Sequence, residues 1–282
     1  MALTTLRRYK EYAKITTSDD DDRLTALIER TSDEIERFCD RIFGTATYRQ
    51  WLAGNDSCYL RLPQSPVQSI GMVSVSTSTV ARLAYSGAAQ IATASCDGTT
   101  LACFTVAAGV PATTNLTLES YPTITLLIAA LPSGFSGTVQ SGMGSEPSRF
   151  IKPFFAEQLH DGQTFDIETP EDSVRVEMSW NEPDTIAGHA VFHSGVNTVF
   201  VMYTAGYDLP SEEAPGNLPP ALIQAVHEIM RDVHSSAGAD GTMQSETLGD
   251  YSYTRNSGEE STLRKIVQSY SDKLSPFRRL SI

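Results

Sequence analysis

The histidines that could bind a metal are few and widely spaced in this sequence. His189 and His193 lie four residues apart, but they flank residues 190–192, a strand-like segment. In a strand this spacing separates the two residues by about 13 Å. His227 and His234 are seven residues apart on an expected helix, and two helical turns are too long a span for one ion. We therefore expect neither pair to bind a metal, and we expect His227 and His234 to lie on the surface of their helix.

A run of four aspartates, Asp19–Asp22, also suggests a metal site. A calcium loop, however, alternates its ligands and needs a glycine at the turn and a glutamate at its twelfth position, and this order is absent here. Carboxylates in the first turn of a helix accept the unpaired backbone N–H groups and complement the helix dipole. We therefore expect these aspartates to begin a helix.

The cysteines and the short motifs give no sign of catalysis. Cys39, Cys58, Cys96 and Cys103 occur singly, which favours small buried side chains over a zinc site or, without a secretion signal, over disulfides. The sequence contains no G-x-S-x-G, no G-x-x-x-x-G-K-[ST] and no H-E-x-x-H. We expect no catalytic residues, no cofactor and no metal, and therefore no enzyme.

The composition is that of a folded, acidic protein. The 282 residues include 21 Lys and Arg against 34 Asp and Glu, a net charge of −13. Tight binding to nucleic acid needs clustered cations, so any DNA should pass over this surface without specific binding. No apolar run is long enough to span a membrane, and no secretion signal is apparent. We expect no membrane partner and a chain that stays in a cytoplasm.

Two helices show the clearest hydrophobic periodicity. Apolar residues recur from Leu24 to Ile42 at helical spacing, and Gly44 is expected to end that helix. A second strong helix begins at residues 218–220, with apolar residues at helical spacing as far as Val233. Both apolar stripes are wide enough to bury, so the two helices are expected to pack together. The packing residues would be Leu27, Ile28, Ile35 and Phe38 from the first helix and Leu222, Val226 and Ile229 from the second.

Between these helices the period changes to two, which is typical of strands. Residues 45–52 and 58–62 are expected to pair as a hairpin through the turn at Gly54. Residues 76–170 are richer in Ala, Thr, Ser and Gly, with short strand patterns and one helix after Pro122. They predict an inserted β-rich module.

The C-terminal segment has a distinct charge. Residues 263–282 contain five Lys or Arg and one Asp, so they carry +4 while the remaining 262 residues carry −17. Apolar residues interleave with these cations and follow a stretch broken by glycines. This pattern favours an arm that is mobile alone and becomes ordered on a partner, although a frayed terminus without a role is the alternative.

Together these elements predict an α+β fold. We expect a helical core with a small antiparallel β-sheet, formed by residues 1–75 and 171–258. To this core are added the β-rich lobe of residues 76–170 and an extended C-terminal arm of residues 259–282.

Two blocks of the sequence carry motifs in a characteristic order. The first block contains Leu6–Tyr12, Asp20–Leu24, Ile35–Phe43, Tyr59–Pro63 and Pro66–Val67, and the second contains Tyr203–Tyr207, Leu218–Val226 and Ser245–Tyr253. In order and spacing these blocks resemble the head–tail connector (adaptor, head-completion) proteins of tailed bacteriophages. The resemblance covers residues 3–75 and 197–255. The long segment between the two blocks departs from the family pattern. Family members usually connect the hairpin to the second helix by a short segment.

The resemblance implies a structural protein of the virion neck, made in the host cytoplasm. Such proteins form a ring, typically of twelve copies, that docks under the portal, prolongs the DNA channel and offers a surface to the next neck or tail protein. In this chain the basic C-terminal arm would bind the portal. The expected portal-binding residues are Arg264, Lys265, Lys273, Leu274, Phe277, Arg278, Arg279 and Leu280.

Two other functions remain open from the sequence. The lobe could be a carbohydrate- or protein-binding module displayed on the virion, or it could contain the site of an enzyme. The second alternative would need converging polar groups, and the sequence shows no such constellation.

Overall fold

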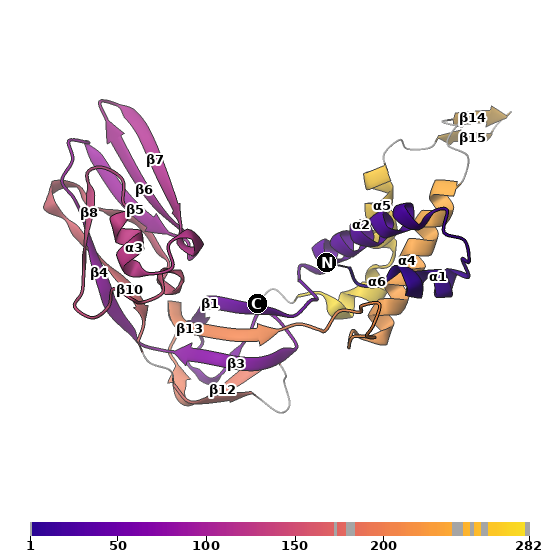
Figure 1. Cartoon of the computed structure of the whole chain (residues 1–282), viewed down its shortest axis with the longest axis horizontal. Helices are drawn as coiled ribbons and strands as arrows, with labels where there is room; N and C mark the ends of the chain where they lie inside the picture. Colours follow the sequence, from indigo (N-terminus) through magenta and orange to yellow (C-terminus); the bar gives the residue numbers. More distant parts are fainter. Residues whose placement is uncertain are drawn as a thin grey trace. The chain divides into compact units, whose positions relative to one another are not determined.

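The computed structural model describes residues 2–171, 174–178, 184–238, 245–248, 251–254 and 259–279. The chain divides into two compact units (Figure 1). One unit, here the helical unit, comprises Met1–Ala46, Pro63–Pro66 and Ala205–Ile282, and the other, the β unit, comprises Thr47–Leu62 and Val67–Thr204.

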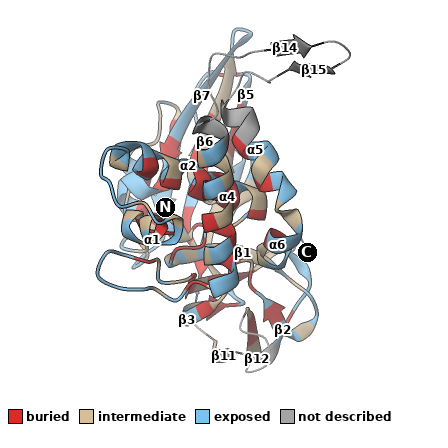
Figure 2. Ribbon diagram, turned by 90° about the vertical axis from the view of Figure 1, so that its right-hand side faces the viewer, coloured by how far each residue is buried: buried red, intermediate tan, exposed pale blue. Residues whose placement is uncertain are grey.

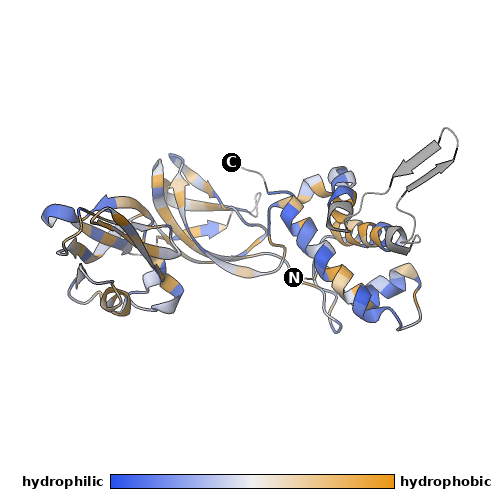
Figure 3. Cartoon of the chain, turned by 90° about the horizontal axis from the view of Figure 1, so that it is seen from above, coloured by the Kyte–Doolittle hydropathy of each residue, from blue (hydrophilic) through white to orange (hydrophobic). Residues whose placement is uncertain are grey.

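The helical unit takes its elements from both ends of the chain. Its helices are α1 (Leu6–Ala13), α2 (Asp21–Cys39), α4 (Pro220–Gly238), α5 (Glu259–Ser269), α6 (Ser271–Leu274) and the 3₁₀ turn η4 (Ser275–Phe277). Strands β14 (Ser245–Leu248) and β15 (Tyr251–Thr254) pair between α4 and α5. Polar and apolar residues alternate along the helices (Figure 3), as expected where one face of a helix is buried.

The helix ends follow local chemistry. The Thr5 side chain caps α1 by accepting a hydrogen bond from the Arg8 backbone N–H. Asp20 is the N-cap of α2 but makes no capping hydrogen bond, and Asp21 in the first turn instead accepts one from Lys10 Nζ at 2.6 Å. The expected end at Gly44 is wrong: α2 ends at Cys39, with Asp40 in the left-handed conformation. A short polar side chain tolerates that conformation, so no glycine is needed.

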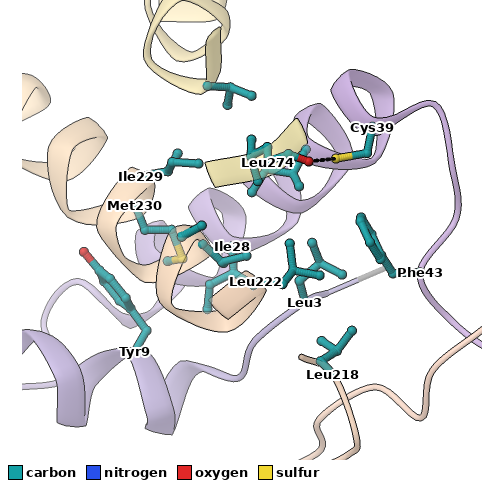
Figure 4. Packing of buried hydrophobic residues seen from close by; sticks show 14 of the residues in the cluster. Leu3, Tyr9, Ile28, Cys39, Phe43, Leu218, Leu222, Ile229, Met230 and Leu274 are labelled. Atoms are coloured by element: carbon teal, nitrogen blue, oxygen red, sulfur yellow. Dashed lines mark hydrogen bonds between the residues drawn. The ribbon is translucent and has the colours of Figure 1, made fainter. Parts of the chain in front are cut away.

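A single hydrophobic cluster holds the helical unit together. Its buried residues come from the N-terminal segment, α2, α4 and the C-terminal helices, and include Leu3, Tyr9, Leu24, Ile28, Ile35, Cys39, Phe43, Leu222, Val226, Ile229, Met230, Leu263, Val267 and Leu274. Figure 4 shows part of this cluster, and Figure 2 shows buried residues recurring along α2 and α4. The buried Ser32 hydroxyl accepts a hydrogen bond from the Leu3 N–H and donates one to the Ile28 carbonyl, which fixes the N-terminal segment to α2.

The β unit consists of strands with one short helix. Its elements are β1 (Ala46–Gly54), β2 (Ser57–Arg61), β3 (Val67–Ser74), β4 (Thr77–Tyr85), β5 (Ile91–Cys96), β6 (Thr100–Ala107), β7 (Val110–Thr117), α3 (Ile124–Ala129), β8 (Phe135–Val139), β9 (Phe154–Gln158), β10 (Thr164–Pro170), β11 (Val176–Met178), β12 (Thr185–Phe192) and β13 (Gly195–Ala205). They form sheets of order β1-β13-β3, β11-β12-β2, β10-β4-β8 and β7-β6-β5-β9.

Residues 76–170 contain two of these sheets and a core of their own. The buried cluster of this lobe runs from Val80 to Ile167 and includes Leu83, Leu101 and Leu127. The first and last strands of the lobe, β4 and β10, pair antiparallel from Thr77↔Pro170 onward. The Glu171 N–H donates to the Ser76 carbonyl at 3.1 Å, so the chain enters and leaves the lobe at neighbouring points.

The predicted hairpin of residues 45–52 with 58–62 is wrong. Strand β1 pairs with β13, whereas β2 pairs with β12 in a different sheet. The turn between β1 and β2 is hydrogen-bonded to the end of β12 instead. The N–H groups of Asn55 and Asp56 both donate to the Phe192 carbonyl. A turn pattern in the sequence identifies the reversal of the chain but cannot identify which strand lies beside it.

The predicted fold class is also wrong. The described chain is mostly β-sheet, and the strands expected to form a small sheet on the helical core, such as β1 and β13, belong to the β unit. The pattern analysis underestimated the strands because several, such as β9, expose most of their residues and show no apolar alternation. The C-terminal arm is not extended either, because residues 259–277 are helical.

Candidate functional site: a basic face on the C-terminal helices

The structure locates the candidate metal ligands that the sequence suggested. In those residues, no three His, Cys, Asp or Glu side chains are grouped closely enough to hold a metal ion. His193 is exposed, 3.8 Å from Asp56, and the side chain of His189 lies outside the described part of the chain. None of the described helices is long and apolar enough to cross a membrane.

The cysteines are free thiols. Cys39, Cys96 and Cys103 are buried and Cys58 is exposed, so the expectation of buried thiols fits three of the four. Burial raises the pKa of each buried thiol to about 11, which keeps these groups neutral and unreactive at physiological pH.

The two histidines of α4 have different environments. The His227 ring is buried, and its Nε2 lies 2.7 Å from the Thr4 hydroxyl. Burial, and secondarily the Arg8 guanidinium, lower the pKa of His227 below its ordinary value. His234 lies further along the helix, beside Arg231. The sequence placed both on a helix surface, and for His227 this was wrong because α1 folds against that face of α4.

The basic C-terminal segment is folded against the helical core. Helix α5 packs on α2 and α4, and Leu263, Val267 and Leu274 are at most 6% exposed. The Cys39 thiol faces the Leu274 carbonyl (Figure 4), and the Arg279 N–H donates to the Cys39 carbonyl at 2.8 Å. The sequence did contain a signal for this packing, because Leu263, Val267, Tyr270 and Leu274 recur at i, i+4, i+7 and i+11.

The expected portal-binding residues therefore divide into two groups. Leu274 is buried and Phe277 is partly buried, so both stabilise the helical core. The cations of the set remain exposed: Arg264, Lys265, Lys273, Arg278 and Arg279. Leu280 lies outside the described residues. We call these five exposed cations the basic face.

Contacts with neighbouring side chains orient part of the basic face. Arg278 lies over the Phe38 ring, 5.3 Å from its centroid. Lys273 pairs with Glu228 of α4, and both Lys273 and Gln224 hold the pKa of that carboxyl below its usual range by hydrogen bonding. For Arg264, Lys265 and Arg279, no ion pair is described in the resolved ranges of the chain. The side chains of these three residues are exposed.

The N-terminal part of the chain is similar to a known protein family. Residues 2–119 match the family model described as head completion protein. This match confirms the resemblance to phage head-completion and connector proteins, and it supports a structural protein of the phage head–tail region and hence a virion component. The match continues beyond Val75 through β4 to β7, into residues that the sequence analysis assigned to an insert. No curated protein matches the chain.

Proposed function

We propose that this chain is a non-enzymatic head–tail adaptor that forms a ring, docks on the portal, prolongs the DNA channel and presents a surface to the next neck or tail protein. The observation that carries the proposal is the match of residues 2–119 to the head completion family. A ring of about twelve copies is the expected assembly. The net charge of −13 supports a channel wall that repels DNA and does not retain it.

We assign portal binding to the basic face. Arg264, Lys265 and Lys273 lie on folded helices, and Arg278 and Arg279 directly follow η4, so binding would not require a mobile arm to become ordered. Exposed cations of this kind accelerate encounter with an acidic surface and make the association sensitive to salt. Arg264, Lys265 and Arg279 are expected to contribute most, since Lys273 already has Glu228 as its partner.

A second function is favoured by one surface feature of the lobe. Strand β9 forms an edge of its sheet, and Phe155 on this strand is 92% exposed. An exposed strand edge can pair with an extended segment of another protein, and Phe155 would add an apolar contact to such a segment. The lobe is therefore the candidate for a binding module displayed on the virion, in addition to the adaptor role.

Native mass spectrometry of the purified full chain, alone and with isolated portal rings, tests the adaptor proposal. A ring, or a ring formed on the portal, is expected. The double reversal Arg264→Glu/Lys265→Glu should reduce co-sedimentation with the portal, whereas Arg49→Glu, an exposed cation of β1, is the matched control and should leave it unchanged. A monomer that ignores the portal would overturn the proposal, and equal attachment of both variants would exclude the basic face as the tether.

A further inference from the structure

The helical unit contains a hollow that the adaptor function does not use. It has a volume of about 530 Å³ and lies where the end of α1 meets the second half of α4. The residues that line it are Tyr9, Tyr12, Ala13, Lys14, Ile15, Arg231, His234 and Ser235.

The charged groups of this hollow are cationic. Lys14 and Arg231 line it together with His234, and no carboxylate does so among the described residues. Arg231 contacts Asp232, whose Oδ1 lies 3.4 Å from both Nε and Nη2, which is long for a charge-assisted hydrogen bond. The other oxygen of Asp232 accepts a hydrogen bond from Tyr270 at 2.7 Å. The Arg231 guanidinium is thus weakly engaged and 58% exposed.

In two other hollows of the described chain, carboxylates balance the charge of the cations. In the hollow between α1 and the start of α2, Lys10 pairs with Asp21 at 2.6 Å, and Arg7 lies 3.7 Å from Glu212. In the hollow beside β10, Lys152 pairs with Glu168 at 3.1 Å. The hollow of Arg231 differs because no carboxylate of its own lining balances its cations.

A buried and unsatisfied donor adds an independent observation. Tyr9 is fully buried, and its hydroxyl has no hydrogen-bond partner in the described structure. In Figure 4 this hydroxyl points away from the part of the cluster around Phe43 and Leu218. Burial, and secondarily Tyr12, raise the pKa of Tyr9 to about 12 against the opposing effect of Arg231, so the phenol stays protonated near these two residues of the hollow. A buried donor without an acceptor is destabilising, so an acceptor placed there would be bound favourably.

We propose that this hollow is a binding site for an oxyanion. Arg231 and Lys14 would balance its charge, and the Tyr9 hydroxyl would donate a hydrogen bond to one of its oxygens. Two sources offer this chemistry: free inorganic phosphate, and the carboxylate of an acidic side chain on another protein. The rings of Tyr12 and Tyr9 lie 4.9 Å and 6.1 Å from the His227 ring, so both tyrosines lie against α4 beside the hollow.

Isothermal titration of the full chain with inorganic phosphate, at constant ionic strength and neutral pH, tests the proposal. Saturable binding is expected, weakened about tenfold or more in Arg231→Gln and in Tyr9→Phe, because each change removes a hydrogen bond to a charged ligand. Arg7→Gln removes a cation from the neighbouring hollow and should bind like the wild type. Tyr9→Phe should melt no lower than the wild type without phosphate, since the donor it removes is unsatisfied.

Two further arms complete the experiment. A tri-glutamate peptide that binds at the same residues and competes with phosphate would assign the site to protein carboxylates, whereas phosphate that co-purifies with the chain and is released on denaturation would assign it to the free anion. Absence of binding by both probes would overturn the proposal. Binding that Arg231→Gln and Arg7→Gln weaken equally would also overturn it, because it would then reflect general charge alone.

Discussion

The environment of single residues makes stability dependent on pH. His227 is buried against Tyr12 and Thr4, and its pKa is lowered in the folded chain. The unfolded chain therefore binds a proton near the ordinary pKa of about 6.5 while the folded chain does not, so the free energy of unfolding falls as the pH decreases below that value. We expect His227→Gln to lose less stability than the wild type between pH 7.5 and 5.5, measured by denaturant unfolding at each pH. The remaining histidines act equally in both proteins, so equal losses would contradict the assignment.

At the scale of elements, the C-terminal helices complete the helical core. The sequence analysis implied that a chain stopped after Gly258 would stay folded, but such a chain loses Leu263, Val267 and Leu274 from the buried cluster. We expect that truncation to unfold or aggregate. The milder variant Leu274→Ala should lower the free energy of unfolding by about 2–5 kcal/mol, because a large cavity replaces a fully buried side chain.

Leu126→Ala serves as the control for that measurement. Leu126 lies on α3 and is 51% exposed, so its loss should change stability little. Denaturant unfolding of both variants provides the comparison. If Leu274→Ala unfolds at the same denaturant concentration as the wild type, the C-terminal helices do not belong to the core in solution.

An element could be predicted where the pattern that identifies it lies within its own segment of the sequence. The stripes of α2 and α4 are visible as helical periodicity, and Ile28, Ile35, Leu222, Val226 and Ile229 all lie in the buried cluster. Strand partners are set by distant parts of the chain, so the pairing of β1 with β13 was beyond a local pattern. The hollow beside Arg231 was not predictable, because it depends on how α1 and α4 meet.

At the scale of the molecule, the lobe is the part most suited to independent folding. Its two sheets and its buried cluster from Val80 to Ile167 lie entirely within residues 76–170. We expect a fragment of residues 76–171 to fold alone, with cooperative thermal unfolding and a β-type circular dichroism spectrum. A fragment without cooperative unfolding would show that the lobe needs the rest of the β unit.

Removing the lobe from the chain should destabilise the rest of the β unit. Phe150 of the lobe packs against Phe200 of β13, with ring centroids 5.1 Å apart, and Lys152 lies over Trp51 of β1. A chain in which a short Gly/Ser linker replaces residues 76–170 would expose these aromatic surfaces, although the adjacent ends of β4 and β10 make the connection itself easy to close.

The pairing of β4 with β10 also determines how the lobe responds to force. Because the chain enters and leaves at the same end of an antiparallel pair, tension between Ser76 and Glu171 loads the backbone hydrogen bonds one after another, beginning at Thr77↔Pro170. Strands pulled in this direction unzip, whereas strands pulled along their length must break many hydrogen bonds at once. The lobe can therefore be thermodynamically stable and still open at low force when the load is applied through this connection.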